Sequence, residues 1–257
     1  MEVERPTTPP PDPADGEARR PAFYALSPGR WRDYVTLLHP PYTAWHLAYV
    51  VIGACLAPEA SVGRLLPTVA AFFCGLGIGA HALDEVRGRP LATGIPRSVL
   101  VFLAVASLAV AAGIGIAGAV TVDGWIGVFV AVGVFIAVAY NLELAGGRLH
   151  GDVPFGLFWG SFPVLTAYFA AAETLRAEAV VAAIFAFALS LAQRQLSTPV
   201  RDLRRRVRRV SGTIDRADGT SEPLDESALL AAPETALATL TAATIALAAA
   251  LAIMRLT

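Results

Sequence analysis

The sequence predicts an all-α fold, a polytopic bundle of about seven transmembrane helices. Of its 257 residues, 55% are hydrophobic and 16% are charged, whereas soluble domains are about 45–50% apolar and about 25% charged. The apolar residues also gather in runs near the roughly 20 residues that a helix needs to cross a bilayer. Seven such runs predict spans at residues 41–58, 62–83, 97–119, 123–142, 153–172, 177–198 and 232–254.

A polar segment precedes these runs. The start, "MEVERPTTPPPDPADGEARRP", is rich in proline and charge and lacks the apolar stretch of a signal peptide. We therefore predict a disordered cytoplasmic tail over residues 1–37, followed by a transmembrane helical domain over residues 38–257. Within that domain, residues 199–231 predict an arginine-rich cytoplasmic loop before the last span. The polar stretch 213–231 is typical of a flexible linker.

The arginines predict the orientation. All twenty basic residues are arginine, and sixteen of them fall in the N-terminal tail and in the loops on the same predicted side. Only Arg64, Arg176 and Arg255 fall on the other side. Because basic residues are retained in the cytoplasm, we predict a multi-pass protein of the cell membrane with a cytoplasmic N-terminus. Seven spans then place the C-terminus outside.

Net charge and cysteines exclude other classes of protein. The net charge is −1, so no basic field predicts nucleic-acid binding. Cys55 and Cys74 lie inside apolar runs without the spacing of a metal or disulfide motif. The partners that we expect are therefore membrane lipid and small molecules. Nothing in the sequence predicts the oligomeric state.

Polar side chains cluster at the predicted cytoplasmic end of the second helix. The stretch "GAHALDEVRGRPLATGIP" contains His81, Asp84, Glu85, Arg87 and Arg89. His81 and Asp84 are three residues apart and share a helical face. Ionisable groups at membrane depth usually mark a functional site, although these could also cap the helix at the level of the headgroups.

Two further clusters end the fourth and sixth helices. "YNLELAGGRLHGD" contains Tyr140, Asn141 and Arg148; its last residue, Asp152, is a suitable N-cap for the next helix. "LAQRQLSTPVRDLRRRVRRVSG" contains Gln193, Arg194 and Arg201. An arginine at membrane depth has to reach water, a phosphate or a carboxylate. The arginine run after Arg201 also suits anionic headgroups.

In this order the three clusters resemble the UbiA superfamily of intramembrane prenyltransferases, whose second helix ends in N-D-x-x-D-x-x-x-D before an R-P-small-x-G loop. In "AHALDEVRGRPLATGIP", Asp84 matches the middle aspartate and Arg89-Pro90 begins the loop. "HPPYTAWHLAYVVIGA" and "DVPFGLFWGSFPVLTAYFAA" look like the family's first and fifth helices, so the resemblance covers about residues 38–212. His81 and Gly88 stand where the family has its first and third aspartates, and the second aspartate motif is missing.

The resemblance implies an enzyme that moves a polyprenyl group from its diphosphate to an unidentified acceptor in a cytoplasm-facing cavity. It implies that Asp84 and Glu85 hold Mg²⁺, which prefers carboxylate and phosphate oxygens. The catalytic residues that it implies are His81, Asp84, Tyr140 and Asn141. The residues expected to bind the diphosphate are Arg87, Arg89, Arg148, Gln193, Arg194 and Arg201.

Other functions stay open. The incomplete aspartate motifs favour a non-catalytic membrane protein that binds an isoprenoid or lipid phosphate through arginine. A terpene cyclase of the UbiA type would use the same cavity. A transporter or channel is disfavoured because the predicted outer side lacks a polar vestibule.

Overall fold

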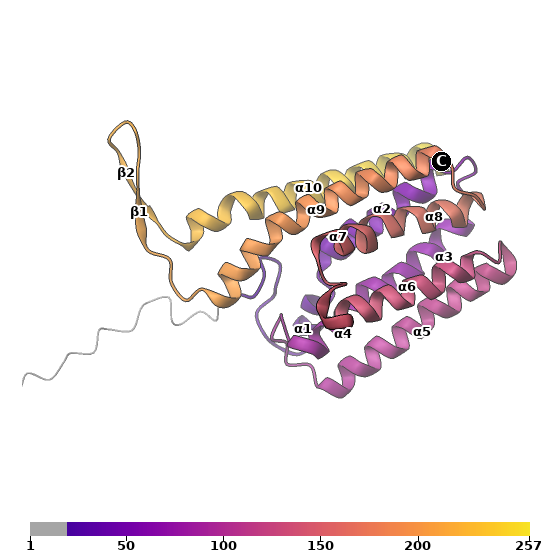
Figure 1. Cartoon of the computed structure of the whole chain (residues 1–257), viewed down its shortest axis with the longest axis horizontal. Coiled ribbons are helices and arrows are strands. Elements are labelled where there is room, and N and C mark those ends of the chain that lie inside the picture. Colours follow the sequence, from indigo (N-terminus) through magenta and orange to yellow (C-terminus); the bar gives the residue numbers. More distant parts are fainter. Residues whose placement is uncertain (1–19) are drawn as a thin grey trace, which may run out of the picture.

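The computed structural model describes residues 20–257, which form one elongated helix bundle (Figure 1). Eight α-helical stretches, one short and seven longer, follow one another in these residues, and two of the longer ones contain π-helical segments, labelled η2 and η4. The elements are α1 (Arg30–Leu37), α2 (Pro40–Leu56), α3 (Val62–Phe72), η2 (Phe73–Ala80), α4 (His81–Gly88), α5 (Arg97–Thr121), α6 (Ile126–Asn141), η3 (Ala145–Gly147), α7 (Asp152–Phe155), η4 (Gly156–Ser161), α8 (Phe162–Ala172), α9 (Ala177–Arg206), β1 (Gly212–Asp215), β2 (Ser221–Leu224) and α10 (Glu226–Leu256).

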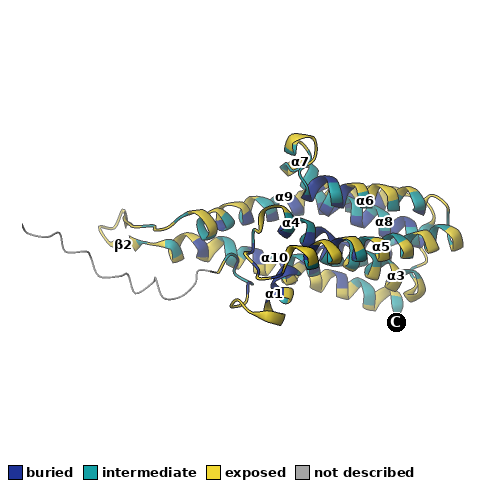
Figure 2. Ribbon diagram, turned by 90° about the horizontal axis from the view of Figure 1, so that it is seen from below, coloured by how far each residue is buried: buried dark blue, intermediate teal, exposed yellow. Residues whose placement is uncertain are grey.

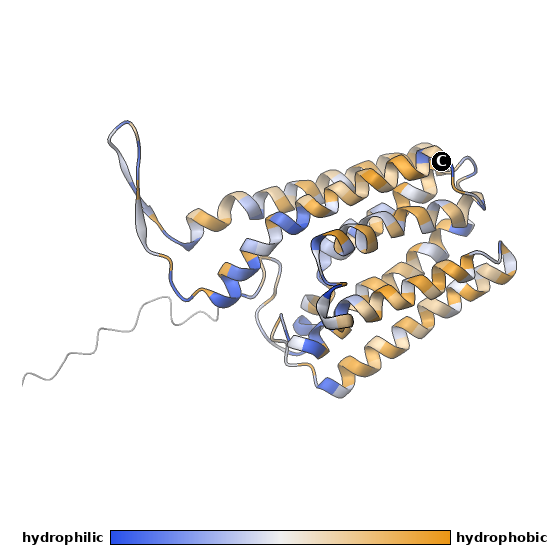
Figure 3. Ribbon diagram, in the orientation of Figure 1, coloured by the Kyte–Doolittle hydropathy of each residue, from blue (hydrophilic) through white to orange (hydrophobic). Residues whose placement is uncertain are grey.

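The predicted all-α class and membrane location agree with these helices. Five stretches are long and apolar enough to cross a membrane: Val62–Gly88, Arg97–Thr121, Asp152–Ala172, Ala177–Arg206 and Glu226–Leu256. The other two predicted spans are the shorter helices α2, of 17 residues, and α6, of 16 residues. Hydrophobic residues predominate along the helices of the bundle, whereas hydrophilic residues gather at the end that carries α1, α4 and the C-terminal turns of α9 (Figure 3).

The segment predicted as a loop over residues 199–231 is largely structured. Helix α9 continues through Pro199 to Arg206, and α10 begins at Glu226. Between them β1 and β2 form an antiparallel hairpin with Gly212 opposite Leu224. An Asp-Gly turn, with Gly219 at φ +87°, reverses the chain, as is usual in hairpins.

The hairpin projects beyond the bundle (Figure 1). Helices α9 and α10 have 30 and 31 residues, so each is about 45 Å long, compared with about 30 Å for the bilayer core. A bidentate ion pair between Arg204 and Glu234, with N–O distances of 2.6 and 2.9 Å, ties the two helices together near this end. We call this end of the molecule the hairpin end.

The predicted N-terminal tail is partly ordered. Residues 1–19 lie outside the described residues, but residues 20–37 differ from the prediction of disorder. Ala22 and Ala25 are buried against Leu91, in the loop after α4, and α1 follows. Aromatic and alanine side chains in "PAFYAL" supply the apolar contact that the charged start of the chain lacks.

Buried residues lie in the middle of the bundle, and the hairpin is exposed (Figure 2). Two close approaches fix the helices. A Cβ atom added to Gly53 of α2 would lie 2.4 Å from the Val164 carbonyl oxygen in α8, and one added to Gly160 of η4 would lie 2.5 Å from the Ala186 carbonyl oxygen in α9. The π-helical turn η4 frees a carbonyl at Trp159, and this oxygen accepts a hydrogen bond from Nδ1 of His46 at 2.8 Å. Such π-helical turns often occur at functional sites.

Candidate functional site

Arg194 is the centre of a polar cluster near the hairpin end. Its side chain is 14% exposed. It donates from Nε to the Asp152 carboxylate at 2.5 Å, from Nη1 to the Tyr140 hydroxyl at 2.7 Å and from Nη2 to the His150 carbonyl at 3.1 Å. Its guanidinium also lies over the Phe155 ring, 5.3 Å from the centroid. The sequence-predicted residues Tyr140 and Arg194 therefore meet, as one cluster that joins α6, α7 and α9.

Asp84 and His81 face the same region from α4. Asp84 is half-buried and interacts electrostatically with His150, Arg201 and Arg205. His81 donates from Nδ1 to the Gly77 carbonyl of η2 at 3.1 Å and stacks on His39 with ring centroids 4.1 Å apart. Asp84 is therefore close enough to the arginine-bearing end of α9 for their charges to interact. Arg87, the arginine closest to Asp84 in the sequence, is not part of this group and pairs with Glu143 instead.

Glu85 was predicted to bind Mg²⁺, but its carboxylate is turned into the protein and is occupied by hydrogen bonds. Its side chain is fully buried, and its two oxygens accept hydrogen bonds from Leu91 N at 3.0 Å, Thr93 N at 2.8 Å and Thr93 Oγ1 at 2.9 Å. Arg89 folds back on the same loop and donates to the carbonyls of Thr93 and Ile95 at 2.7 and 3.0 Å. Both charged groups therefore hold the loop after α4 in shape.

Other sequence-predicted residues lie apart from the cluster. Arg87 forms an exposed ion pair with Glu143 at 2.7 Å, which holds the pKa of the Glu143 carboxyl below its usual range. Arg148 is exposed after the η3 turn. Asn141 is buried, and its amide donates to the Ala137 carbonyl of its own helix at 2.7 Å. Arg201 is half-buried near the hairpin end, with a bond of 3.2 Å to Thr198.

The N-terminal segment supplies residues that the sequence analysis missed. The Tyr24 hydroxyl lies 2.7 Å from Nδ1 of His39, and the Tyr24 ring packs edge-on against Tyr42. Burial, and then the positive charges of His81, Arg205 and Arg201, lower the pKa of His39 well below its usual range. Burial likewise raises the pKa of Tyr24.

One signal could have found these residues. His39, Tyr42, His46 and Tyr49 recur every three or four residues, which places polar groups along one face of an otherwise apolar helix. His46 lies within the first predicted span, at residues 41–58, where its polar ring is unusual. The contribution of Tyr24 has no comparable signal, because its position depends on how the N-terminal segment folds back.

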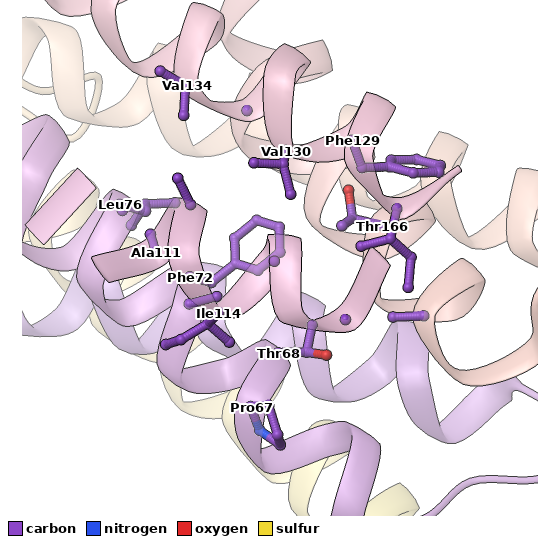
Figure 4. Close-up of a pocket in the computed structure, with 18 of the residues that line it drawn as sticks. Pro67, Thr68, Phe72, Leu76, Ala111, Ile114, Phe129, Val130, Val134 and Thr166 are labelled. Carbon is purple, nitrogen blue, oxygen red and sulfur yellow. The ribbon is translucent and has the colours of Figure 1, made fainter. Parts of the chain in front are cut away.

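An apolar cavity of about 400 Å³ lies between α3, α5, α6 and α8. Apolar side chains such as Phe72, Ile114 and Val130 line it, together with Thr166 (Figure 4). The Thr166 hydroxyl oxygen has no hydrogen-bond partner within residues 20–257. Ligand sites commonly have volumes of about 300–1,000 Å³. Trp159 lines one part of this cavity and packs edge-on against Tyr140, with centroids 5.4 Å apart. The apolar cavity and the Arg194 cluster thus share a wall.

The described residues contain no group of three or more His, Cys, Asp and Glu side chains placed to hold a metal ion. Asp84 is the one predicted ligand whose carboxylate accepts no hydrogen bond in residues 20–257. Because Mg²⁺ often binds one or two carboxylates together with substrate phosphates, Asp84 fits a single ion that a diphosphate also holds. Comparison with protein-family models, curated proteins and solved structures finds no match to this chain.

Proposed function

We propose that the protein is a UbiA-like prenyltransferase with seven spans, which moves a polyprenyl group from its diphosphate to an acceptor. The observation that supports this most directly is that Trp159, which lines the apolar cavity, packs against Tyr140 of the Arg194 cluster. A prenyl diphosphate has the same division into a polyanionic head and an apolar chain. The head belongs at the hairpin end and the chain in the cavity.

The charges at the hairpin end suit a diphosphate. Arg201 and Arg205 make no ion pair with a carboxylate among the described residues, and both act on Asp84. Guanidinium groups bind phosphate oxygens through paired hydrogen bonds. In this proposal Asp84 holds a Mg²⁺ ion against the diphosphate, and the metal neutralises the charge of the leaving group. Arg194 keeps Tyr140 in place beside the reacting carbon.

A non-catalytic binder of isoprenoid or lipid phosphates is the second candidate. The observation that favours it is the use of Glu85 by the loop after α4, which leaves Asp84 as the single carboxylate for a metal. A binder of this kind would hold the phosphate through Arg201 and Arg205 alone. Its affinity would not depend on Mg²⁺.

The deciding experiment measures diphosphate release by the purified full-length protein in detergent. Labelled geranylgeranyl diphosphate or a longer homologue is offered with Mg²⁺ and with a mixture of membrane-extracted acceptors. We expect release that falls by at least about 100-fold in Asp84→Asn, the scale of removing one electrostatic contact to the transition state. Asp202→Asn is the control, because Asp202 is exposed on α9 and forms an ion pair with Arg206, at the surface and not in the cluster.

Three outcomes separate the alternatives. Release that persists unchanged in Asp84→Asn would contradict the proposed role of Asp84. Tight binding without turnover and without need of Mg²⁺, weakened in Arg201→Ala, would favour the non-catalytic binder. Diphosphate release without an acceptor, with a hydrocarbon product, would point to a terpene cyclase.

A further inference from the structure

Residues 20–29, which precede α1, are bound to two different parts of the hairpin end. Ala25 is 1% exposed and belongs to a buried cluster with Leu91 of the loop after α4. The Pro21 carbonyl accepts a hydrogen bond from Nε of Arg205, in the last turns of α9, at 3.2 Å. The segment therefore bridges the loop after α4 and the end of α9, and we call it the N-terminal strap.

Tyr24 is the aromatic residue at the middle of the strap. Its hydroxyl lies 2.7 Å from Nδ1 of His39, at the start of α2. Its phenol also interacts electrostatically with Arg205, Arg201 and Asp84. These are the charged groups that the proposed function assigns to the diphosphate and its Mg²⁺. The strap thus occupies space beside the groups that the diphosphate would need.

The two arginines next to the strap have no partner of opposite charge in residues 20–257. Arg201 and Arg205 are four residues apart and share one face of α9, and their charges repel each other. Their side chains donate to the Thr198 hydroxyl and the Pro21 carbonyl, which are both neutral. Hydrogen bonds to a charged acceptor are about twice as strong. A polyphosphate anion would therefore compete well with the strap for these two arginines.

The strap has a fixed end from which it can swing. The backbone N–H of Leu26 donates to Thr36 Oγ1, and that of Gly29 donates to Asp33 Oδ1, each at 3.1 Å, so this end is tied to α1. Gly29 has φ +144°, a conformation that glycine adopts readily. A few residues at the end of an element can absorb the rotation of a moving segment. Residues 20–25 can therefore move while α1 stays in place.

We propose that the N-terminal strap closes the hairpin end when no ligand is bound and that a polyphosphate anion displaces it. In the closed form Tyr24 fills the space beside Asp84, and in the open form the anion binds Arg201 and Arg205. Because only the open form binds the anion, the strap lowers the apparent affinity by the fraction of molecules that are open. The statement that this anion is the diphosphate of the prenyl donor rests on the proposed function, whereas the displacement itself does not.

The test follows the accessibility of a buried strap residue. In a background with Cys55→Ala and Cys74→Ala, Ala25→Cys places a single thiol at the buried position. The purified full-length protein in detergent is reacted with a maleimide in the presence of Mg²⁺, with and without inorganic pyrophosphate. We expect saturating pyrophosphate to raise the labelling rate by at least about tenfold, because the rate follows the population of the open form.

Three variants show whether the strap causes this change. Leu26→Cys is the matched control, because the neighbouring position is already exposed, and its labelling rate should not respond to pyrophosphate. Arg201→Ala, combined with Ala25→Cys, should need a higher pyrophosphate concentration for the same effect. Tyr24→Phe removes one hydrogen bond of the strap and should raise the rate for Ala25→Cys without pyrophosphate by about three- to tenfold.

An unchanged rate for Ala25→Cys at every pyrophosphate concentration would overturn the inference. Slower labelling would overturn it as well, since the strap would then close over the anion. If Ala25→Cys itself loosens the strap and reacts as fast as Leu26→Cys without pyrophosphate, Ala22→Cys, at a position 5% exposed, decides instead.

The assay contains no prenyl group, so its result is independent of turnover. A strap that pyrophosphate displaces, in a protein that releases no diphosphate from a prenyl diphosphate, would refute the proposed function and leave the strap standing. Diphosphate release by a protein whose strap does not respond to pyrophosphate would refute the strap alone.

Discussion

At the scale of single residues, the loop after α4 depends on one buried carboxylate. Glu85→Ala would leave Leu91 N, Thr93 N and Thr93 Oγ1 without their acceptor. Since each unsatisfied buried donor costs about 1–3 kcal/mol, we expect the free energy of unfolding to fall by about 3 kcal/mol. Thermal unfolding in detergent measures this change. Glu59→Ala, at an exposed turn, should leave the melting temperature nearly unchanged.

A second single-residue prediction concerns pH. Burial and neighbouring positive charge lower the pKa of His39 in the folded protein, whereas its ordinary value is 6.5. The unfolded chain therefore binds a proton below about pH 6.5 that the folded chain does not bind. The stability that neutral His39 contributes is complete above this pH and is lost as the pH falls, by up to about 1.4 kcal/mol per pH unit.

The measurement is the melting temperature in detergent between about pH 7 and about pH 5. His39→Gln keeps a hydrogen-bonding partner for Tyr24 and cannot titrate, so it should flatten this dependence. His81 stacks on His39 and keeps part of the effect. An equally steep dependence in His39→Gln would show that other groups cause it.

At the scale of elements, close backbone contact holds α2 against α8. Gly53→Ala would place a Cβ atom 2.4 Å from the Val164 carbonyl oxygen, so the helices must separate. Overpacking of this kind destabilises by about 1–3 kcal/mol. Gly113→Ala is the matched control on α5, where an added Cβ meets nothing within 4 Å, and the better helix former should be neutral or stabilising there. Equal melting temperatures for the two variants would contradict the predicted contact.

Some elements of the fold could be predicted from the sequence and others could not. Apolar runs predicted each helix of the bundle, because length and hydrophobicity alone decide whether a segment suits a membrane. The hairpin was missed although Asp218-Gly219 and the N-cap Asp225 are standard signals for a turn and a helix start. The polar composition of residues 213–231 predicted a linker instead. The two strands are brought together because α9 packs against α10, and this contact cannot be predicted from the hairpin segment alone.

Some residues of the candidate site could be singled out from the sequence, whereas their contacts could not. Asp84, Tyr140 and Arg194 could be singled out because charge at membrane depth is unusual. Whether a charged side chain faces a ligand or its own loop depends on the loop's path, so the bonds of Glu85 and Arg89 could not be foreseen. Spacing alone would have placed His46 on a polar face, but its bond to Trp159 requires the π-helical turn η4.

At the scale of the whole molecule, the two ends of the bundle differ in charge. The hairpin end carries α1, the hairpin and the arginine-rich end of α9, whereas the turn between α8 and α9 lies at the opposite end with the C-terminus (Figure 1). The positive-inside rule predicts that the hairpin end faces the cytoplasm. The proposed diphosphate would enter from that side.

Cysteine accessibility tests this orientation and the number of spans together. In a background with Cys55→Ala and Cys74→Ala, single cysteines are introduced by Ser61→Cys, Thr174→Cys or Thr220→Cys, all at exposed positions. A membrane-impermeant maleimide should label the first two in intact cells, because four predicted spans separate them and both then lie at the outer end. It should label Thr220→Cys, at the hairpin tip, only after permeabilisation.

Each departure from this pattern has a separate meaning. Labelling of Thr220→Cys in intact cells, with protection of the other two, would invert the orientation and move the polar end outside. Labelling of Thr174→Cys alone would show that one of the four helical stretches between Ser61 and Thr174 does not span, and α6, with its 16 residues, is the shortest of them. At 1.5 Å per residue α6 is about 24 Å long, slightly short of the bilayer core, so its crossing depends on the neighbouring elements α5 and η2 that pack along it and on local thinning of the bilayer.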